Sequence, residues 1–266
     1  MRRSVLVFLM LIGGGATASA QLTTMRAGVP ELLIPAAGAV SGANGTFFRS
    51  DITVVNYRTD ADQRVRFTWL AENANGASAP VLEMNVAKST GFTSEDFVTD
   101  ILKQSGLGSI LITAIDSSGN FDSGGKLHAT ARIWSNQPGL SSGTVSQSFP
   151  VIAVSDINVM SGKLVILSQR RDDRYRTNVG IINLDPQAQT FRVTVQSAER
   201  TELLNVSLQP LSMTQVALTG PPATNLQIGV TNITGGFQSS RFLAYGSTVD
   251  NTTGDSWSSL SFEPPQ

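Results

Sequence analysis

The sequence predicts an all-β protein made of two tandem antiparallel β-sandwich domains of the immunoglobulin-like or fibronectin-like kind, with one short helix in the first. Three observations support this prediction. One segment of nine residues occurs twice, short stretches alternate between apolar and polar residues, and clusters of Gly, Asn, Asp and Ser separate these stretches. Many short strands joined by turns are typical of sandwiches, and two units of roughly 110 residues each fit the usual size of one.

The repeated segment covers residues 48–56 and returns at residues 175–183. Each copy contains an aromatic residue, an arginine, a hydroxyl residue, an Asp or Asn, a mostly β-branched run and a final asparagine. The arginines are Arg49 and Arg176, and the final asparagines are Asn56 and Asn183. The same number of positions separates the members of each pair, which indicates that a whole domain is repeated. We therefore expect a first domain at residues 21–155 and a second at 156–266, with equivalent cores.

Alternation of period two and turn-forming residues define the strands of the first unit. Val65, Phe67 and Trp69 alternate with polar neighbours, as in a half-buried strand. We expect Pro35 to end the first strand and the small, Gly-rich residues 38–46 to form a loop. The predicted strands are 32–35, 49–56, 65–69, 81–86, 110–115, 127–134 and 144–152.

One segment of the first unit has helical spacing instead. Within residues 94–104 the apolar residues Phe97, Val98, Ile101 and Leu102 fall on one helix face. Thr93 is suited to cap this helix, and Gly106 follows as a stop. We expect a short helix packed across one end or edge of the first sandwich.

The second unit repeats the strand pattern without the helix. Phe191, Val193 and Val195 alternate in the same way, and a Gly-Pro-Pro sequence at residues 220–222 stands where the helix would be. Near the ends of the units, Ala129, Ala131 and Ile133 match Ala244, Gly246 and Thr248. The predicted strands are 164–167, 175–183, 191–195, 203–208, 214–218, 226–230, 242–249 and 257–262.

Two motifs carry a resemblance to a known group of proteins. The first is the aromatic-Arg-Ser/Thr-Asp/Asn start of each repeat, and the second is the closing sequence Val-Asp-Asn-Thr-Thr-Gly-Asp at residues 249–255. The chain resembles tandem β-sandwich (Ig-like) repeat proteins secreted by bacteria, whose units carry both motifs, over nearly its whole mature length. The first unit departs from the closing motif, because residues 134–139 are Trp-Ser-Asn-Gln-Pro-Gly. The role of the closing turn is therefore open in the first unit.

Residues 1–20 have the pattern of a secretion signal. Arg2 and Arg3 give a positive start, residues 5–12 form an apolar run too short to span a bilayer, and Ala-Ser-Ala at 18–20 is a cleavage site. Cleavage near Ala20 would release a chain beginning at Gln21. A retained membrane anchor is the alternative, and three consecutive glycines at residues 13–15 argue against it. We expect a secreted, periplasmic or cell-surface protein with no membrane span after signal cleavage.

Composition narrows the range of possible functions. The chain has no cysteine and one histidine, so disulfides, thiol catalysis, cysteine-bound zinc and multi-histidine zinc sites are excluded. The formal net charge is −1, and the Lys and Arg residues are scattered rather than clustered, which argues against a nucleic-acid partner. The single histidine leaves a serine triad without support and no catalytic constellation stands out, so we expect neither an enzyme nor a cofactor.

The best candidates for binding are His128, Arg132 and Trp134, which alternation places on one face of a strand. An aromatic ring beside an arginine on a flat face suits a sugar or a protein partner. The alternative is that Trp134 covers the domain interface or the end of the sandwich, because tryptophan is mostly buried in proteins. For Arg49 and Arg176 we expect a structural role, with each guanidinium bonded to a carbonyl or an acid of its own domain.

Two turns rich in oxygen ligands are weak candidates for calcium. One contains Asp250, Asn251 and Asp255, and the other contains Asp116, Asn120 and Asp122. Neither matches an EF-hand loop, and ordinary turn chemistry explains the same residues.

These observations favour an exported, non-enzymatic β-sandwich protein that acts as a structural or adhesion module at the cell surface or outside the cell, with an extracellular protein or a glycan as partner. One alternative is a carbohydrate-binding module that uses Trp134 and its neighbours, or the loop aromatics Tyr57 and Trp257. The other is a hydrolase with paired carboxylates, because a sequence does not reveal the distance between two acids.

Overall fold

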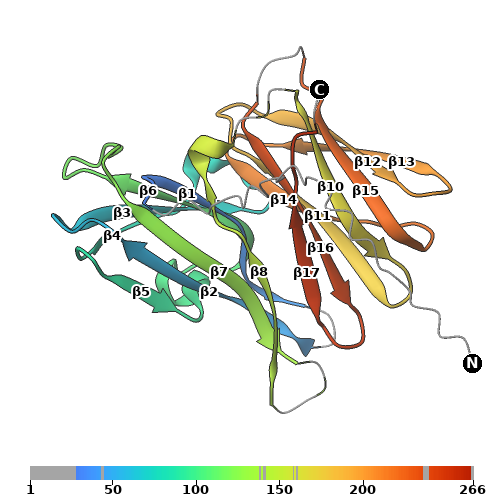
Figure 1. Ribbon diagram of the computed structural model, residues 1–266, viewed down its shortest axis with the longest axis horizontal. Coiled ribbons are helices and arrows are strands. Elements are labelled where there is room, and N and C mark those ends of the chain that lie inside the picture. Colours follow the sequence, from blue (N-terminus) through green and yellow to red (C-terminus); the bar gives the residue numbers. More distant parts are fainter. Residues whose placement is uncertain are drawn as a thin grey trace, which may run out of the picture.

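The computed structural model describes residues 28–42, 45–137, 139, 142–157, 159, 161–235 and 240–264. The predicted signal peptide and its cleavage site at Ala20 lie outside these residues. The described chain forms two antiparallel β-sandwiches that lie side by side (Figure 1). The predicted all-β fold class is thereby confirmed. The domain boundary between residues 155 and 156 stays a prediction.

The first sandwich consists of β1 to β9. These strands are β1 Glu31–Ser41, β2 Phe47–Asn56, β3 Gln63–Ala71, β4 Val81–Val86, β5 Gly91–Ser94, β6 Gly106–Ile115, β7 Leu127–Asn136, β8 Thr144–Phe149 and β9 Ile152–Ala153. One face has the order β4-β3-β6-β1, with β9 paired to β1, and the other has the order β5-β2-β7-β8. A short pairing of β1 with β2 links the two faces at one end.

The second sandwich consists of β10 to β17. These strands are β10 Lys163–Arg171, β11 Tyr175–Asn183, β12 Gln189–Gln196, β13 Thr201–Leu208, β14 Ser212–Ala217, β15 Ala223–Asn232, β16 Phe242–Asp250 and β17 Ser256–Leu260. Its sheets have the orders β10-β15-β12-β13 and β14-β11-β16-β17. Strand by strand, these orders correspond to the orders β1-β6-β3-β4 and β5-β2-β7-β8 of the first sandwich. The two copies of the repeated segment, β2 and β11, occupy the same place in their sheets.

The register between strands also agrees in the two sandwiches. Val54 pairs with Ala129 across β2 and β7, and Ile181 pairs with Ala244 across β11 and β16. Val54 and Ile181 hold the same position in the repeated segment, and Ala129 and Ala244 match near the ends of the two units. Each pair of matching residues is therefore joined by the same cross-strand pairing in both sandwiches.

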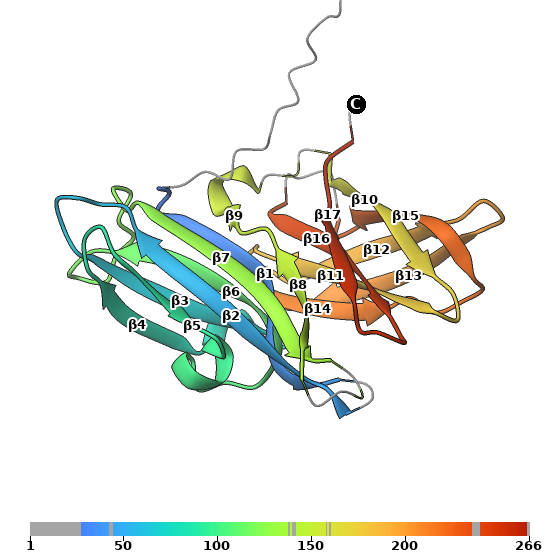
Figure 2. The same cartoon turned by 60° about the horizontal axis from the view of Figure 1, so that its bottom comes forward.

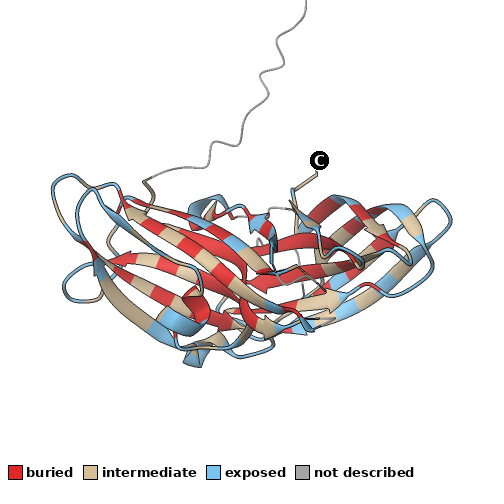
Figure 3. Cartoon of the chain, turned by 90° about the horizontal axis from the view of Figure 1, so that it is seen from below, coloured by how far each residue is buried: buried red, intermediate tan, exposed pale blue. Residues whose placement is uncertain are grey.

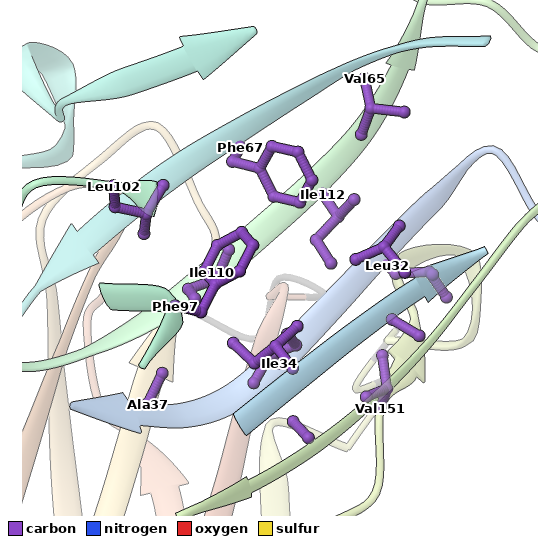
Figure 4. Close-up of a cluster of buried hydrophobic side chains, with 14 of the residues drawn as sticks. Leu32, Ile34, Ala37, Val65, Phe67, Phe97, Leu102, Ile110, Ile112 and Val151 are labelled. Atoms are coloured by element: carbon purple, nitrogen blue, oxygen red, sulfur yellow. The ribbon is translucent and has the colours of Figure 1, made fainter. Parts of the chain in front are cut away.

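Each sandwich encloses its own hydrophobic core. Phe67 and Trp69 of β3 are buried in the first core, and Val193 and Val195 of β12 are buried in the second. Period-two alternation produces this arrangement, because every second side chain of a strand points to the same face. In the first core Phe97 reaches in from outside the sheets and lies beside Ile110 (Figure 4).

A buried asparagine at the end of each repeated strand holds the following turn. Asn56 accepts a hydrogen bond from the N–H of Arg58, and its amide nitrogen donates to the carbonyl of Val86 at the end of β4. Asn183 makes the equivalent contacts in the second sandwich: it accepts from the N–H of Asp185 and donates to the carbonyls of Gln187 and Gln209. Both side chains are fully buried, so these bonds are shielded from water.

The predicted helix is shorter than expected. It is a single π-helical turn at Phe97–Ile101, and its N-cap is Asp96 rather than Thr93. Thr93 belongs instead to β5, where its hydroxyl lies 2.8 Å from that of Thr53 in β2. Pairing of β5 with β2 takes up the first residues of the predicted helix, and the positive φ of Lys103 ends the turn.

Among the strands that differ from expectation, β1 and the strand predicted over residues 144–152 show the largest changes. Residues 38–41, predicted as the start of a loop, continue β1, because a bulge between Ile34 and Ala37 accommodates Pro35 within the strand. Their small side chains suit a crowded position, since a Cβ on Gly38 would lie 3.2 Å from the carbonyl oxygen of Gly106. The strand predicted over residues 144–152 is divided into β8 and β9, with Pro150 between them.

A third hydrophobic cluster joins the two sandwiches. It combines side chains of the first sandwich with others from β11, β14 and β16 of the second. Figure 3 shows buried residues in the strands of both sandwiches. Its buried members are Leu33, Ala36, Leu70, Phe149, Val154, Ile157, Ile182, Leu184, Met213, Leu243 and Tyr245. Backbone hydrogen bonds cross the same boundary, from Asn73 to Met213 and from Gly76 to Pro210.

The ring of Tyr245 lies at the centre of this contact. It packs at right angles to Phe149 of the first sandwich, with ring centroids 5.2 Å apart. The space for the ring exists because the cross-strand neighbour is Gly180: a Cβ there would lie 2.0 Å from the Cζ atom of Tyr245.

We predict that Asn183→Ala lowers the free energy of unfolding by about 2–4 kcal/mol, because it removes a fully buried side chain and leaves two carbonyls and one N–H without their partner. Urea denaturation measures the change. The control is Asn205→Ala, at an exposed position on β13, which should stay within about 0.5 kcal/mol of the wild type. Equal stability of the two variants would contradict the role of the buried asparagine.

We predict that Gly180→Ala destabilises the protein by about 1–3 kcal/mol, since the new methyl group must displace the Tyr245 ring from the interface. The matched control is Gly229→Ala, because a Cβ at Gly229 would lie 3.8 Å from its nearest neighbours. Thermal or urea unfolding of both variants tests the prediction, which fails if Gly180→Ala is no less stable than Gly229→Ala.

Candidate functional site

The three predicted binding residues on β7 do not converge on one site. Arg132 donates from Nε to Asp51 at 2.8 Å, and Trp134 donates from its indole nitrogen to the carbonyl of Glu95 at 2.8 Å. The ring of His128 lies 6.0 Å from that of Tyr57. His128 and Trp134 are separated along an extended strand by roughly 20 Å. Each side chain is thus engaged with a different neighbour.

The loop aromatics are also held by contacts within the chain. Trp257 donates to the carbonyl of Ser168 at 3.1 Å and packs edge-on against Tyr175. Tyr57 is about half exposed beside His128.

The two arginines of the repeat occupy equivalent positions but different surroundings. Arg49 lies on the outer face of its sheet, where its Nε is 3.4 Å from Asp96 and its guanidinium lies over the rings of Phe47 and Trp134. Arg176 donates to the amide oxygen of Asn251 at 2.6 Å. Arg49 therefore has both kinds of partner expected for it, an acid and a carbonyl. Arg176 has the neutral side-chain amide of Asn251 instead.

The main carboxylate of each calcium candidate accepts hydrogen bonds from the backbone of its own turn. Asp250 accepts from the N–H groups of Thr252 and Thr253 and from Arg174. Asp116 accepts from Ser118 and Asn120 in the same manner. These bonds lower the pKa of both carboxyls. Within the described parts of the chain, no group of three His, Cys, Asp or Glu side chains is arranged to hold a metal ion.

A cavity of about 360 Å³ lies where the two sandwiches meet. It is bounded by β1, β2, β6, β7 and β8 of the first sandwich and by β11, β14, β16 and β17 of the second. In this region β8 lies next to β17 (Figure 2). Its apolar wall comprises Val40, Phe48, Leu107, Ile133, Val145, Phe149 and Val249. Its main polar side chains are Glu72, Gln147, Arg176, Asn178, Gln215 and Ser247.

The cavity follows from the alternation of β11 and β16. The outward-facing residues of these strands are apolar at one end, where Ile182, Leu243 and Tyr245 pack against the first sandwich. The other end is mostly polar: Arg176, Asn178 and Ser247 line the cavity there, together with Val249. The apolar end closes the interface and the polar end leaves it open.

Two hydrogen bonds between the sandwiches flank the cavity. Ser247 donates from its hydroxyl to Oε1 of Gln147 at 2.9 Å, and the N–H of Gln215 donates to Glu72 at 3.0 Å. The amide nitrogen of Gln147, Nε2, is buried without a hydrogen-bond partner in the described structure. Such an atom carries an unmet desolvation cost.

The Tyr245 hydroxyl lies near the Glu72 end of the cavity and donates to Gln215 at 3.0 Å. Burial raises the pKa of Tyr245 above its ordinary value, and the negative charge of Glu72 raises the pKa further. At the other end, burial lowers the pKa of the Arg176 guanidinium. The two ionisable side chains that line the cavity are therefore of opposite charge and lie at different ends.

The repeat in the sequence singles out Arg176, but it does not predict the cavity. A usable signal was present in β16, where every residue from Phe242 to Asp250 is buried. The run Phe-Leu-Ala-Tyr-Gly-Ser-Thr-Val contains no charged residue and lacks the alternation seen in β7. Such a run indicates a strand covered on both faces.

No protein-family model matches the chain, and no curated protein matches its sequence. Among solved structures, Thermotoga maritima protein 1070 aligns with a TM-score of 0.33 and 11% identity, over 39% of this chain and 95% of its own. Vicilin from hazelnut, Corylus avellana, aligns with a TM-score of 0.24 and 8% identity, over 84% and 75% of the two chains. The CupB6 tip adhesin from Pseudomonas aeruginosa aligns with a TM-score of 0.15 and 10% identity, over 88% and 99%. These scores are too low to support an argument about function.

In the part of the chain that the structure describes, no helix has the length and apolar character needed to cross a membrane.

We predict that stability falls at alkaline pH through Tyr245. Because the folded-state pKa of Tyr245 lies above that of the unfolded chain, near 10, the unfolded state loses this proton first as pH rises. The stabilisation is complete below about pH 10 and is lost progressively above it. The free energy of unfolding, measured against pH by urea denaturation, should fall less steeply in Tyr245→Phe than in the wild type. Parallel curves for the two proteins would contradict this assignment.

Proposed function

We propose that this chain is an exported, non-enzymatic module with a structural or adhesive role at the cell surface or outside the cell. In this proposal the partner is an extracellular protein, and a glycan partner belongs to the alternative, a carbohydrate-binding module. Its localisation follows from the signal-like residues 1–20, and its mode of action from the arrangement of the two sandwiches.

The observation that carries the proposal is the hydrophobic cluster between the sandwiches. Tandem domains joined only by a linker move relative to each other, whereas a large apolar interface holds them in one orientation. Here Tyr245 and Phe149 pack across the boundary, and the Asn73–Met213 hydrogen bond extends the contact through the backbone. A two-domain unit of fixed orientation suits a spacer or a presenting surface, and it needs no disulfide for this purpose.

The arrangement of polar groups gives less support to the other two functions. A carbohydrate site usually offers exposed aromatic rings, but the Trp134 indole is bonded to Glu95 and covered on one side by Arg49. A glycosidase needs two facing carboxylates, and Glu72 is the one carboxylate among the described residues that line the cavity.

We predict that the purified chain from Gln21 onward, coupled to beads, adheres to cell surfaces or extracellular matrix and gives no selective signal on a glycan array. Heat-denatured protein on the same beads is the control, because adhesion by a folded surface should be lost on denaturation.

The array distinguishes this proposal from its alternative. Selective glycan binding that disappears in Trp134→Ala but persists in Trp257→Ala would overturn the proposal in favour of a carbohydrate-binding module. Release of sugar from any bound glycan would overturn it in favour of a hydrolase.

A further inference from the structure

We propose that the cavity between the two sandwiches binds a small organic carboxylate with an apolar body, and that Arg176 receives the carboxylate. This site is separate from the adhesive role proposed above and does not depend on it. It rests on three features of the cavity: an arginine whose charge is not neutralised, a buried amide with one free end, and an apolar wall.

Arg176 supplies the charge. Its guanidinium is held by the amide oxygen of Asn251, and no carboxylate among the described residues lies within ion-pair distance of it. Other arginines of the chain have an acid as partner. Arg171, for example, forms an ion pair with Glu202. A partly buried cation without a counter-ion favours an anion, and the planar guanidinium suits a carboxylate because it can donate two parallel hydrogen bonds.

Gln147 supplies a second donor. Its relative exposure is 9%, and its Nε2 atom has no partner, whereas its Oε1 atom is fixed by Ser247. Ser247 pairs with Asn178, which lies two residues from Arg176 on the same face of β11. Ser247 therefore anchors the Gln147 amide at a register position two residues, or roughly 7 Å, along the strand from Arg176, and both side chains line the same cavity.

The apolar wall determines the rest of the ligand. Side chains such as Phe48, Ile133, Val145 and Phe149 surround the same space, and they have no hydrogen bond to offer. The volume of about 360 Å³ is at the lower end of the range for small-molecule pockets, about 300–1,000 Å³. Glu72 does not prevent binding of an anion at Arg176, because it lies beside Gln215, whose partner Gly180 is four residues from Arg176, or roughly 14 Å.

The repeat offers an internal comparison. Arg49 occupies the position in β2 that Arg176 occupies in β11, but it faces outward and is paired with Asp96. The same residue type at the same place in the fold is thus neutralised on the open sheet and left without an acid in the cavity. This makes Arg49 a matched control for the proposed site.

The experiment measures the binding of octanoate and phenylpropionate, with octanamide and phenylpropionamide as neutral counterparts of the same shape, by calorimetry on the folded chain from Gln21 onward. At least one carboxylate should bind saturably and roughly tenfold or more tightly than its amide, the difference expected for a charge-assisted hydrogen bond. Arg176→Gln should remove this preference, whereas Arg49→Gln should retain it. Absence of saturable binding by both carboxylates, equal binding of acid and amide, or equal effects of the two substitutions would overturn the proposal.

A second measurement needs no change at Arg176 and therefore covers the case in which Arg176→Gln does not fold. The side-chain NH₂ resonances of Gln147, identified by their loss in Gln147→Met, should shift when the bound carboxylate is added to the wild-type protein and stay in place with its amide. Resonances that do not move on saturation with the carboxylate would place the ligand elsewhere and refute the site.

Discussion

Water is kept from the outward face of β16 by the first sandwich, and the rest of the arrangement depends on this contact. Leu243 and Tyr245 would otherwise expose a wide apolar surface on the sheet β14-β11-β16-β17. Covering them orients one sandwich against the other, because a flat ring seated on Gly180 permits little sliding. The same contact creates the cavity, since the strands continue past the apolar residues into a polar stretch that the first sandwich reaches only through Gln147 and its neighbours.

Local patterns in the sequence were sufficient for the fold but not for the interface. Alternation located β3 and β12, and the repeat placed β2 and β11 correctly, because both signals depend on residues close together in the chain. The continuation of β1 through Ala36 and Gly38 was missed, since small residues and glycine usually mark a loop. Here they are required by tight packing between β6 and the second sandwich, which no local pattern reveals. The predicted helix was too long because pairing of β5 with β2 overrides helical spacing.

The candidate site shows the limit of reasoning from repeats. Arg49 and Arg176 have nearly identical sequence neighbours, so any inference from the segment alone must assign them the same role. Their difference arises from what lies against each side chain: β8 of the first sandwich lies beside the cavity that contains Arg176, whereas Arg49 is partly exposed and contacts Asp96 of its own sandwich. The residues of β7 that attracted attention, His128, Arg132 and Trp134, correspond by register to the covered face of β16. On the first sandwich these positions contact only side chains and backbone of their own sandwich, whereas the equivalent positions of β16 face the other sandwich.

The central position of β1 has a consequence for the order in which the protein is assembled. β1 pairs with β6, which begins at Gly106, and the side chains that cover Leu33 and Ala36 come from strands that are made later still. A chain that emerges from the ribosome in sequence order therefore presents an apolar strand long before its partners exist. Unpaired strands of this kind invite intermolecular pairing. Residues 31–39 thus depend on strands made much later for both their hydrogen-bond partners and their cover from water.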